Sequence, residues 1–264
     1  MKPFTVCILL YGNYPGMAER LLKSLSRPAW YPKFDLRIGL NDVSDATMRV
    51  VGRYSGDGYS PLRYFGELPF YKYPLMRNMF WQQTPFPTPI ETPYTMWFDD
   101  DSWLSRRCPD QWFSAVAASL DTADMLGSIW EKDYEGDQRQ FIEQMPWYTG
   151  KPLLPKMRFC TGGWWAIKTR ILERWNWPDE RLEHNGGDTL LGALCHQQGY
   201  RLQNAPGGVH INADDAGRCS TAPRRGFSQR PLGWNYRVSP DKSSPAAPPV
   251  ASHDTWLDIL EGKA

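Results

Sequence analysis

The stretch that most constrains the fold is FTVCILLY, an unbroken apolar run at residues 4–11. A strand exposed on one face alternates apolar and polar residues, so a continuous run indicates a strand buried on both faces. FDLRIGL at 34–40 and PYTMWF at 93–98 are further strand-like segments, and residues 15–26 carry the apolar spacing of a helix between the first two. This alternation of strands and helices predicts an α/β fold with a mostly parallel central sheet flanked by helices.

The remaining segments extend the same pattern as far as Ile211. Ser44 is a predicted helix N-cap and Gly199 a predicted C-cap. Residues 131–157 are polar and aromatic without periodicity, which indicates an irregular surface segment. We expect one domain over 1–215 and an irregular, Arg/Pro-rich extension over 216–264 that packs on or near the active site. Helices are predicted over 72–83, 109–120, 171–175 and 188–198, and strands over 124–130, 158–168, 200–202 and 208–211.

Bulk composition limits the classes of protein to be considered. A chain of 264 residues can build a stable core without covalent staples. Its five cysteines form no CxxC pair, which indicates free thiols in a reducing cytoplasm, bacterial or of a virus-infected cell. No apolar stretch approaches the ~18 residues of a membrane span, so we expect a protein without a membrane partner. The net charge of +1 gives no overall attraction to nucleic acid.

Three consecutive acids, Asp99, Asp100 and Asp101, follow the predicted strand 93–98. Each close carboxylate pair costs about 4 kcal/mol at an effective dielectric near 20, so a partner should neutralise the charge. Ligands of open α/β sheets bind at this carboxyl edge. If the strand continued, Asp99 and Asp101 would face one side and could hold Mg²⁺ or Mn²⁺, whose other ligands are commonly phosphate oxygens. The alternative is an acidic turn that caps the following helix.

Several segments together resemble the family 2 glycosyltransferases of the GT-A fold, over roughly residues 4–211. They are ILLYGNYPG, LNDVSDAT, YKYPLMRNM, WFDDDS, FCTGGWWAIKTRIL and NGGDTLLGALCHQQGYRL, in the family's order. The resemblance implies a metal-dependent transferase that moves a sugar from a nucleotide-sugar, expected to be a UDP-sugar, to an acceptor hydroxyl with inversion. The residues it implies in donor binding are Leu10, Tyr11, Gly12, Asn13, Asp42, Arg77, Asp99, Asp100, Gly162, Gly163 and Trp164.

The resemblance also implies the metal ligands and the catalytic base. Asp99, Asp101 and His210 would hold Mn²⁺ or Mg²⁺, although a lone histidine is as readily structural. Asp188 would be the general base, and the alternative is a helix cap without chemistry. A carboxylate at a helix N-terminus is stabilised as the anion, which would keep Asp188 deprotonated and make it a weaker base. The family helix usually begins Glu-Asp, whereas this one begins Gly187-Asp188.

Further side chains are candidates without a motif of their own. Trp164 and Trp165 are candidates for stacking on the sugar, and His184 lies four residues before Asp188, near the expected acceptor position. The segment 201–242 is locally basic, and a solvated loop is its alternative reading. It contains seven basic residues and three acidic ones. Four of the basic residues could close over the diphosphate, which are Arg218, Arg224, Arg225 and Arg230.

Other functions stay open at this point. A sugar nucleotidyltransferase also needs a carboxylate-held metal but should have a Gly-rich phosphate loop, and YGNYPGMAER has only two glycines. A carbohydrate-binding module would explain the thirteen tryptophans and thirteen tyrosines but not the acids. For a transferase, the acceptor is a saccharide, a protein, or a hydroxymethylated pyrimidine in DNA, as with virus-encoded transferases that modify their own genomes. Phosphate contacts by the late arginines would make DNA binding fall steeply with salt.

Overall fold

A computed structural model describes residues 2–41, 43–54, 60–64, 72–81, 89–182 and 186–211, with the backbone alone at 60–64. Its centre is a seven-stranded sheet in the order β3-β2-β1-β4-β7-β6-β8, beside a two-stranded ribbon of β5 and β9. The strands are β1 (Phe4–Tyr11), β2 (Phe34–Asn41), β3 (Ser60–Tyr64), β4 (Tyr94–Asp99), β5 (Ser102–Leu104), β6 (Met125–Lys132), β7 (Met157–Lys168), β8 (Leu202–Asn204) and β9 (Val209–Ile211).

The pairing of the strands places the acidic triplet beside the Gly-Gly segment. The first four strands in the chain, β1 to β4, pair in parallel, so their carboxyl ends share one edge. Strand β7 runs antiparallel to both β4 and β6, and Phe98 of β4 lies opposite Trp164. The reversal of β7 therefore brings Gly162 and Gly163 to the carboxyl edge, next to Asp99.

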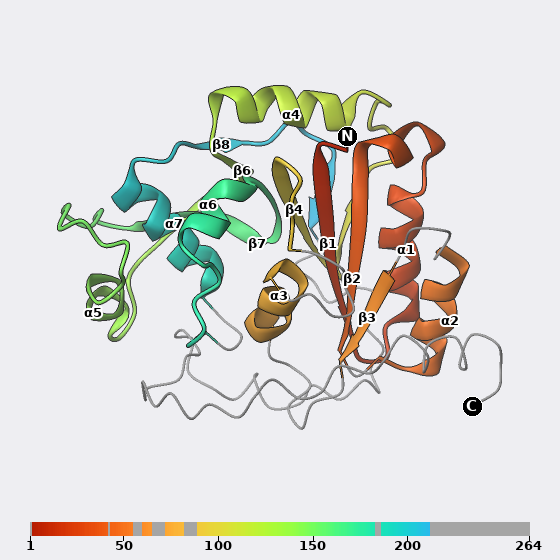
Figure 1. Ribbon diagram of the computed structural model, residues 1–264, viewed down its shortest axis with the longest axis horizontal. Coiled ribbons are helices and arrows are strands. Elements are labelled where there is room, and N and C mark those ends of the chain that lie inside the picture. The colour runs from red at the N-terminus through yellow and green to blue at the C-terminus, as the bar shows by residue number, and fades with distance from the viewer. Residues whose placement is uncertain are drawn as a thin grey trace.

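Helices cover both faces of the sheet, as Figure 1 shows. One buried cluster joins β1, β2 and β4 to helices α1, α2 and α4 and the short 3-10 helix η1, and the other joins the sheet to α3, α5, α6 and α7. The bounds are α1 (Pro15–Leu25), η1 (Pro28–Lys33), α2 (Asp45–Tyr54), α3 (Lys72–Trp81), α4 (Trp112–Thr122), α5 (Gln138–Glu143), α6 (Thr169–Arg174) and α7 (Gly187–Gln198).

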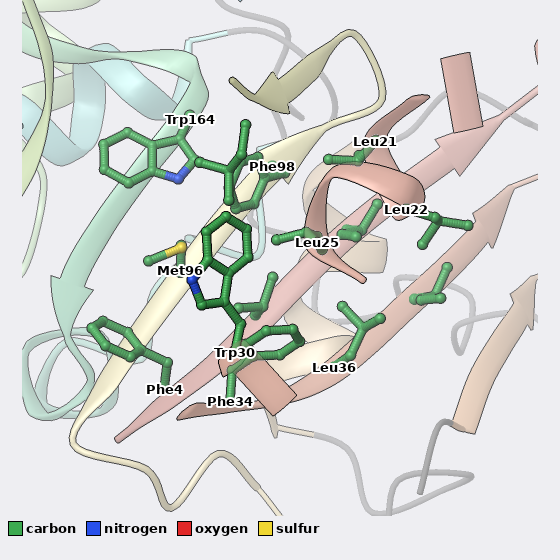
Figure 2. Packing of buried hydrophobic residues seen from close by; sticks show 14 of the residues in the cluster. Phe4, Leu21, Leu22, Leu25, Trp30, Phe34, Leu36, Met96, Phe98 and Trp164 are labelled. Carbon is green, nitrogen blue, oxygen red and sulfur yellow. The ribbon is translucent and has the colours of Figure 1, made fainter. Parts of the chain in front are cut away.

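The two clusters explain why the first strand is apolar throughout. Phe4, Val6, Ile8 and Leu10 point into the α1 side, and Cys7 and Leu9 into the α7 side. Figure 2 shows the first cluster, in which rings and aliphatic side chains from β4, β7 and α1 interdigitate. Each fully buried aliphatic or aromatic side chain contributes about 1.5–3 kcal/mol. The prediction of a mostly parallel α/β sheet flanked by helices is confirmed.

Some local predictions differ from the structure. Helix α4 begins at Trp112 rather than near Pro109, whose carbonyl instead accepts a hydrogen bond from the Trp112 amide at 2.9 Å. The segment 131–157, expected to be irregular, contains α5 because Phe141 and Ile142 reach the second core. Strand β3 and the ribbon of β5 and β9 were also not anticipated as such.

Other predictions concern thiols, membranes and the C-terminal segment. Cys7, Cys108, Cys160 and Cys195 are free and buried, as expected, and Cys219 lies outside the described residues. Among the helices that the structure describes, none combines the length and apolar character needed to cross a membrane. The predicted extension 216–264 and its late arginines also lie outside the described residues, so the boundary at 215 stays a prediction.

Candidate functional site

The turn after β1 is tied to the start of α2. Gly12 adopts a φ of +62°, which favours glycine, and its carbonyl accepts a hydrogen bond from the Ser44 amide at 3.1 Å. The Ser44 hydroxyl donates to Asn13 Oδ1 at 2.7 Å and accepts from the Thr47 amide at 3.2 Å, so Ser44 caps α2 as predicted. The neighbouring Asp42 lies outside the described residues. This turn is a fixed loop at the carboxyl edge of the sheet.

Asp99 is neutralised by a lysine that the sequence did not single out. The Lys72 ammonium lies 2.7 Å from Oδ1 and 2.8 Å from Oδ2 of Asp99, and the Trp97 indole donates to Oδ1 at 2.7 Å. Lys72 also donates to the Gly162 carbonyl at 3.4 Å. The two charged side chains are 14% and 28% exposed, so solvent screens the pair only in part. Lys72 thus supplies the charge that the acidic triplet requires at Asp99.

The other two acids occupy a turn rather than a strand. Strand β4 ends at Asp99, and Asp100 and Asp101 precede β5. The expectation that Asp99 and Asp101 share one side of a continuous strand is therefore wrong, because strand alternation does not extend through the turn. Asp100 is buried and Asp101 half-buried. Ser102, next in the chain, donates to the Gly163 carbonyl at 2.8 Å and joins this turn to β7.

Asp188 lies at the start of α7 and faces the same edge. Its Oδ1 accepts a hydrogen bond from the Thr189 amide at 2.9 Å. Its Oδ2 points toward Gly162, where an added Cβ would lie 3.4 Å from Oδ2 and 3.5 Å from the Lys72 ammonium nitrogen. Gly162 therefore lies close to both the base candidate and the Lys72–Asp99 pair. The structure brings three predicted residues close to one another, Asp99, Gly162 and Asp188, and adds Lys72, which was not predicted.

The electrostatic environment of Asp188 differs from the sequence-based expectation. Burial raises the pKa of Asp188, and the charge of Asp99 raises it further. The charges of Lys72 and Lys132 and the Thr189 amide oppose this change, but the net direction is upward. Burial thus outweighs the Thr189 amide, the part of the helix N-terminus that holds Asp188 and favours its anion. A raised pKa makes the carboxylate a stronger base toward the proton of an acceptor hydroxyl.

Arg77, the basic residue predicted to approach the nucleotide, has other partners in this structure. Its guanidinium donates to the Asn176 and Pro178 carbonyls at 2.8 and 2.9 Å and to Asn176 Oδ1 at 2.8 Å. It therefore fastens α3 to the loop after α6. Lys72, five residues earlier on α3, is the basic group at the carboxyl edge. The signal for it was present in YKYPLMRNM, which carries two basic residues.

Several predicted donor contacts belong to core residues. Leu10, Trp164 and Trp165 are 1–2% exposed, so their side chains pack in the core. The indoles of the two tryptophans are therefore not free to stack on a sugar. Trp164 packs against Phe98 with ring centroids 6.1 Å apart (Figure 2). Tyr11 is half-buried, with its ring edge-on to Tyr14. The predicted contacts of Leu10 and Trp164 with the donor can therefore be made only by their backbone atoms, and they stay predictions.

His210 lies on β9, opposite Trp103 of β5. Its exposed ring stacks on Trp103 with centroids 5.2 Å apart, and the Arg20 guanidinium also lies over Trp103, at 3.8 Å. No group of three or more His, Cys, Asp or Glu side chains in the described ranges is arranged to hold a metal ion. Both oxygens of Asp99 are already engaged. The described residues therefore do not form a metal site by themselves. His184 lies outside the described residues.

Comparisons with known proteins bear on the fold. No family model matches the sequence, and no curated protein matches it. The structure is similar to S. aureus TarS 1-349, with 16% identity and a TM-score of 0.51 over 80% of this chain and 60% of that one. It is also similar to TarS 1-349 in complex with UDP, with 14% identity and a TM-score of 0.51 over 82% and 62% of the two chains. The chain thus spans about 60% of the length of TarS 1-349 and 38% of that of TarS, and the likeness confirms the GT-A-like α/β fold.

A third structure has a lower TM-score than these two. It is the mannosyltransferase PcManGT from Pyrobaculum calidifontis in complex with GDP-Man and Mn²⁺, with 15% identity over 77% of this chain and 55% of that one. Its TM-score of 0.48 is too low to establish a shared fold.

Proposed function

We propose that this protein is a glycosyltransferase that moves a sugar from a nucleotide-sugar, most simply a UDP-sugar, to an acceptor hydroxyl. The observation that carries the proposal is that Asp188 Oδ2 and the Lys72 ammonium both approach Gly162, next to Asp99. A base with a raised pKa thus lies beside a cation at the sheet edge where ligands of open α/β folds bind. The fold shared with TarS, whose structure was determined with UDP, supports this assignment.

The donor is proposed to bind across the carboxyl ends of β1 and β4. The Gly12–Asn13 turn lies at the end of β1, and Asp42 is proposed to contact the base. The Lys72 ammonium is proposed to shift part of its contact from Asp99 to the diphosphate, since one ammonium can bind both anions. Asp100 and the backbone at Gly162 and Gly163 would then face the sugar. The role of Arg77 at the nucleotide stays a prediction.

The proposed reaction is one in-line displacement with inversion at the anomeric carbon. Asp188 Oδ2 takes the proton of the acceptor hydroxyl as its oxygen forms a bond to that carbon. The bond between the anomeric carbon and the diphosphate oxygen breaks, and the nucleoside diphosphate leaves with the bonding electron pair. Lys72 stabilises the negative charge that develops on the diphosphate. The products are the glycosylated acceptor, the nucleoside diphosphate and a protonated Asp188.

Dependence on Mn²⁺ or Mg²⁺ is a separate part of the proposal. Asp101 and His210 stay the predicted ligands, with Asp99 as the third when Lys72 turns to the diphosphate. A divalent ion at this position would supply Lewis-acid stabilisation of the diphosphate, and magnesium in particular usually takes substrate phosphates and waters as its remaining ligands. The steps assigned above to Asp188 and Lys72 do not pass through the ion.

The acceptor is proposed to be a hydroxymethylated pyrimidine in DNA, with a saccharide or a protein as alternatives. The support is the local excess of basic residues in 201–242, most of which lies outside the described residues. Arginine contacts to phosphates would make transfer to DNA fall steeply as salt increases. A salt-insensitive transfer would instead favour a neutral saccharide.

The deciding experiment is a panel of UDP-sugars and GDP-mannose, with and without Mn²⁺, offered with hydroxymethylated DNA, unmodified DNA or oligosaccharides. Release of nucleoside diphosphate with transfer of label supports a glycosyltransferase. A sugar nucleotidyltransferase would instead join a nucleoside triphosphate and a sugar phosphate and release pyrophosphate. A carbohydrate-binding module would retain saccharides without turnover. Absence of diphosphate release from every donor would overturn the proposal.

A further inference from the structure

The ammonium of Lys72 is surrounded by groups that attract a cation. It lies 2.7 and 2.8 Å from Oδ1 and Oδ2 of Asp99 and donates to the Gly162 carbonyl oxygen at 3.4 Å. The rings of Trp97 and Tyr73 add weaker attraction, with centroids 5.6 and 6.0 Å away. Carboxylate and carbonyl oxygens are also the ligands that suit Mg²⁺ and Mn²⁺. The lysine and a divalent ion would therefore compete for one position beside Asp99.

The carboxylate of Asp99 has little capacity left for an ion. Its Oδ1 lies 2.7 Å from both the Lys72 ammonium and the indole nitrogen of Trp97. A carboxylate oxygen has about two lone pairs, so these two donors occupy Oδ1 fully. An ion bound to Oδ2 would lie close to the ammonium, which is 2.8 Å from that oxygen, and the positive charges would repel each other. The Lys72 ion pair thus disagrees with a metal ion held by Asp99.

We propose that Lys72 prevents a divalent ion from binding to Asp99 until a nucleotide-sugar is bound, an inference that rests on the proposed function. The diphosphate of the donor attracts the ammonium away from Asp99, and the carboxylate can then bind Mn²⁺ or Mg²⁺. Phosphate oxygens complete the coordination of the ion. The nucleotide therefore binds before the ion or together with it, and each raises the affinity of the protein for the other.

A purely structural ion pair makes a different prediction. Lys168 and Asp124 form a pair of similar length and exposure at the opposite edge of the sheet. Loss of either lysine leaves a carboxylate without its cation, so a general effect of charge would be equal at the two edges. Beside Asp99, however, the position of the ammonium also borders the Gly162 carbonyl, and Asp188 Oδ2 approaches the same glycine. Only this edge offers an ion several oxygens once the lysine is removed.

The test measures Mn²⁺ binding to the nucleotide-free protein by electron paramagnetic resonance. We expect Lys72→Met to bind Mn²⁺ about 10- to 100-fold more tightly than wild type, because a charged contact that competes for the carboxylate is removed. Lys72→Arg keeps the positive charge and should stay near the wild-type value. Lys168→Met is the matched control and should also stay near it. Adding Asp99→Asn to Lys72→Met should remove the gain.

A second measurement tests the coupling to the nucleotide. UDP should raise the affinity for Mn²⁺ about 10-fold more in wild type than in Lys72→Met, because Asp99 is already accessible in the variant. The complex that UDP and Mn²⁺ form in solution is common to both proteins and cancels in this comparison. Equal enhancement by UDP in the two proteins would contradict the coupling.

Equal Mn²⁺ affinity of nucleotide-free Lys72→Met and wild type would overturn the inference. So would an equal gain in Lys168→Met, which would indicate a general effect of charge, or a gain that persists with Asp99→Asn, which would place the ion elsewhere. Urea unfolding shows first that each variant is folded, and Lys72→Gln provides the same test if Lys72→Met is not.

The nucleotide-free measurement separates failure of this inference from failure of the proposed function. If Lys72→Met gains affinity for Mn²⁺ but wild type turns over no nucleotide-sugar, Lys72 still blocks Asp99 and the transferase assignment fails. If wild type transfers sugar but Lys72→Met gains no affinity, the transferase assignment stands and the role of Lys72 at Asp99 is refuted.

Discussion

The two edges of the sheet carry nearly identical ion pairs. At the carboxyl edge Lys72 lies 2.7 Å from Asp99, and the side chains are 14% and 28% exposed. At the opposite edge Lys168 lies 2.9 Å from Asp124, with exposures of 18% and 21%. Distance and burial therefore do not tell a functional pair from a structural one.

The surroundings of the two pairs differ. Both carboxylate oxygens of Asp124 have a hydrogen-bond partner, because the Arg201 amide donates to Oδ2 at 2.9 Å and Lys168 donates to Oδ1. Burial tends to raise the pKa of Asp124, but these hydrogen bonds and the charge of Lys168 lower it overall. The carboxyl edge instead holds a second carboxylate, Asp188, whose pKa is raised. A group whose environment opposes its charge, beside a cation, distinguishes the edge of the proposed site from the opposite edge.

The largest expected effect is on turnover. Asp188→Asn should reduce turnover about 100- to 10,000-fold, the range for removal of a general base, with nucleotide-sugar affinity nearly unchanged. Assays of nucleoside diphosphate release and calorimetric titration of the donor would measure the two quantities. Asp124→Asn removes a carboxylate at the opposite edge and should leave turnover near the wild-type value. Full turnover by Asp188→Asn would mean that the base lies elsewhere.

Exchanging each lysine tests the comparison next. Lys72→Met and Lys168→Met should each lower the free energy of unfolding by about 1–2 kcal/mol, because both leave a partly exposed carboxylate without its cation. Only Lys72→Met should also weaken donor binding, by about 10- to 100-fold, because a charged contact to a phosphate is lost. Urea unfolding and donor titration of both variants would show this. Equal donor affinity in the two would remove Lys72 from the site.

A methyl group in contact with both the base and the cation should have a smaller effect. Gly162→Ala places Cβ in ordinary contact with Asp188 and Lys72, at 3.4 and 3.5 Å, so the protein should fold. The added group would narrow the space for the reacting atoms and lower kcat about tenfold. Gly16→Ala on α1, where nothing lies within 4 Å of the added Cβ, is the control. Unchanged kcat in Gly162→Ala would place the reaction away from this residue.

The smallest effects are on stability as a function of pH, and they have opposite signs. The raised pKa of Asp188 stabilises the fold below the ordinary value of 3.8, and this contribution is lost as pH rises through the folded-state pKa. Asp188→Asn should therefore gain stability relative to wild type as pH rises. The lowered pKa of Asp124 stabilises the fold above 3.8, so Asp124→Asn should lose stability at neutral pH. Urea unfolding from about pH 3 to 8 would detect both. Changes of the same sign would refute the comparison.

The elements of the sheet were predictable because their signals are local. The apolar run 4–11 implies burial on both faces, and the spacing of Met17, Leu21 and Leu22 indicates the buried face of α1. Asp188 could be placed at a helix start for the same reason. The reversal of β7 could not be read from FCTGGWWAIK, because the direction of a strand depends on its distant pairing partners.

The site was less predictable because it depends on contacts between distant segments. Lys72 and Arg77 lie on one helix, and only the fold shows that one reaches Asp99 and the other the Asn176 loop. Tryptophans in a strand suggest either a stacking surface or a core, and Trp164 belongs to the core. The pKa of Asp188 was expected from the helix terminus alone, whereas burial among neighbouring elements determines its direction.

The most direct test is the structure of the Asp188→Asn variant with a bound nucleotide-sugar. The opposite edge offers a competing site, an open hollow of about 710 Å³ lined in part by Tyr94, Lys168 and Arg170. We predict that the diphosphate lies against Lys72 and the turn at Gly12, with the sugar beside Gly162. A nucleotide-sugar in the hollow by Lys168 and Arg170, with the carboxyl edge empty, would contradict the account.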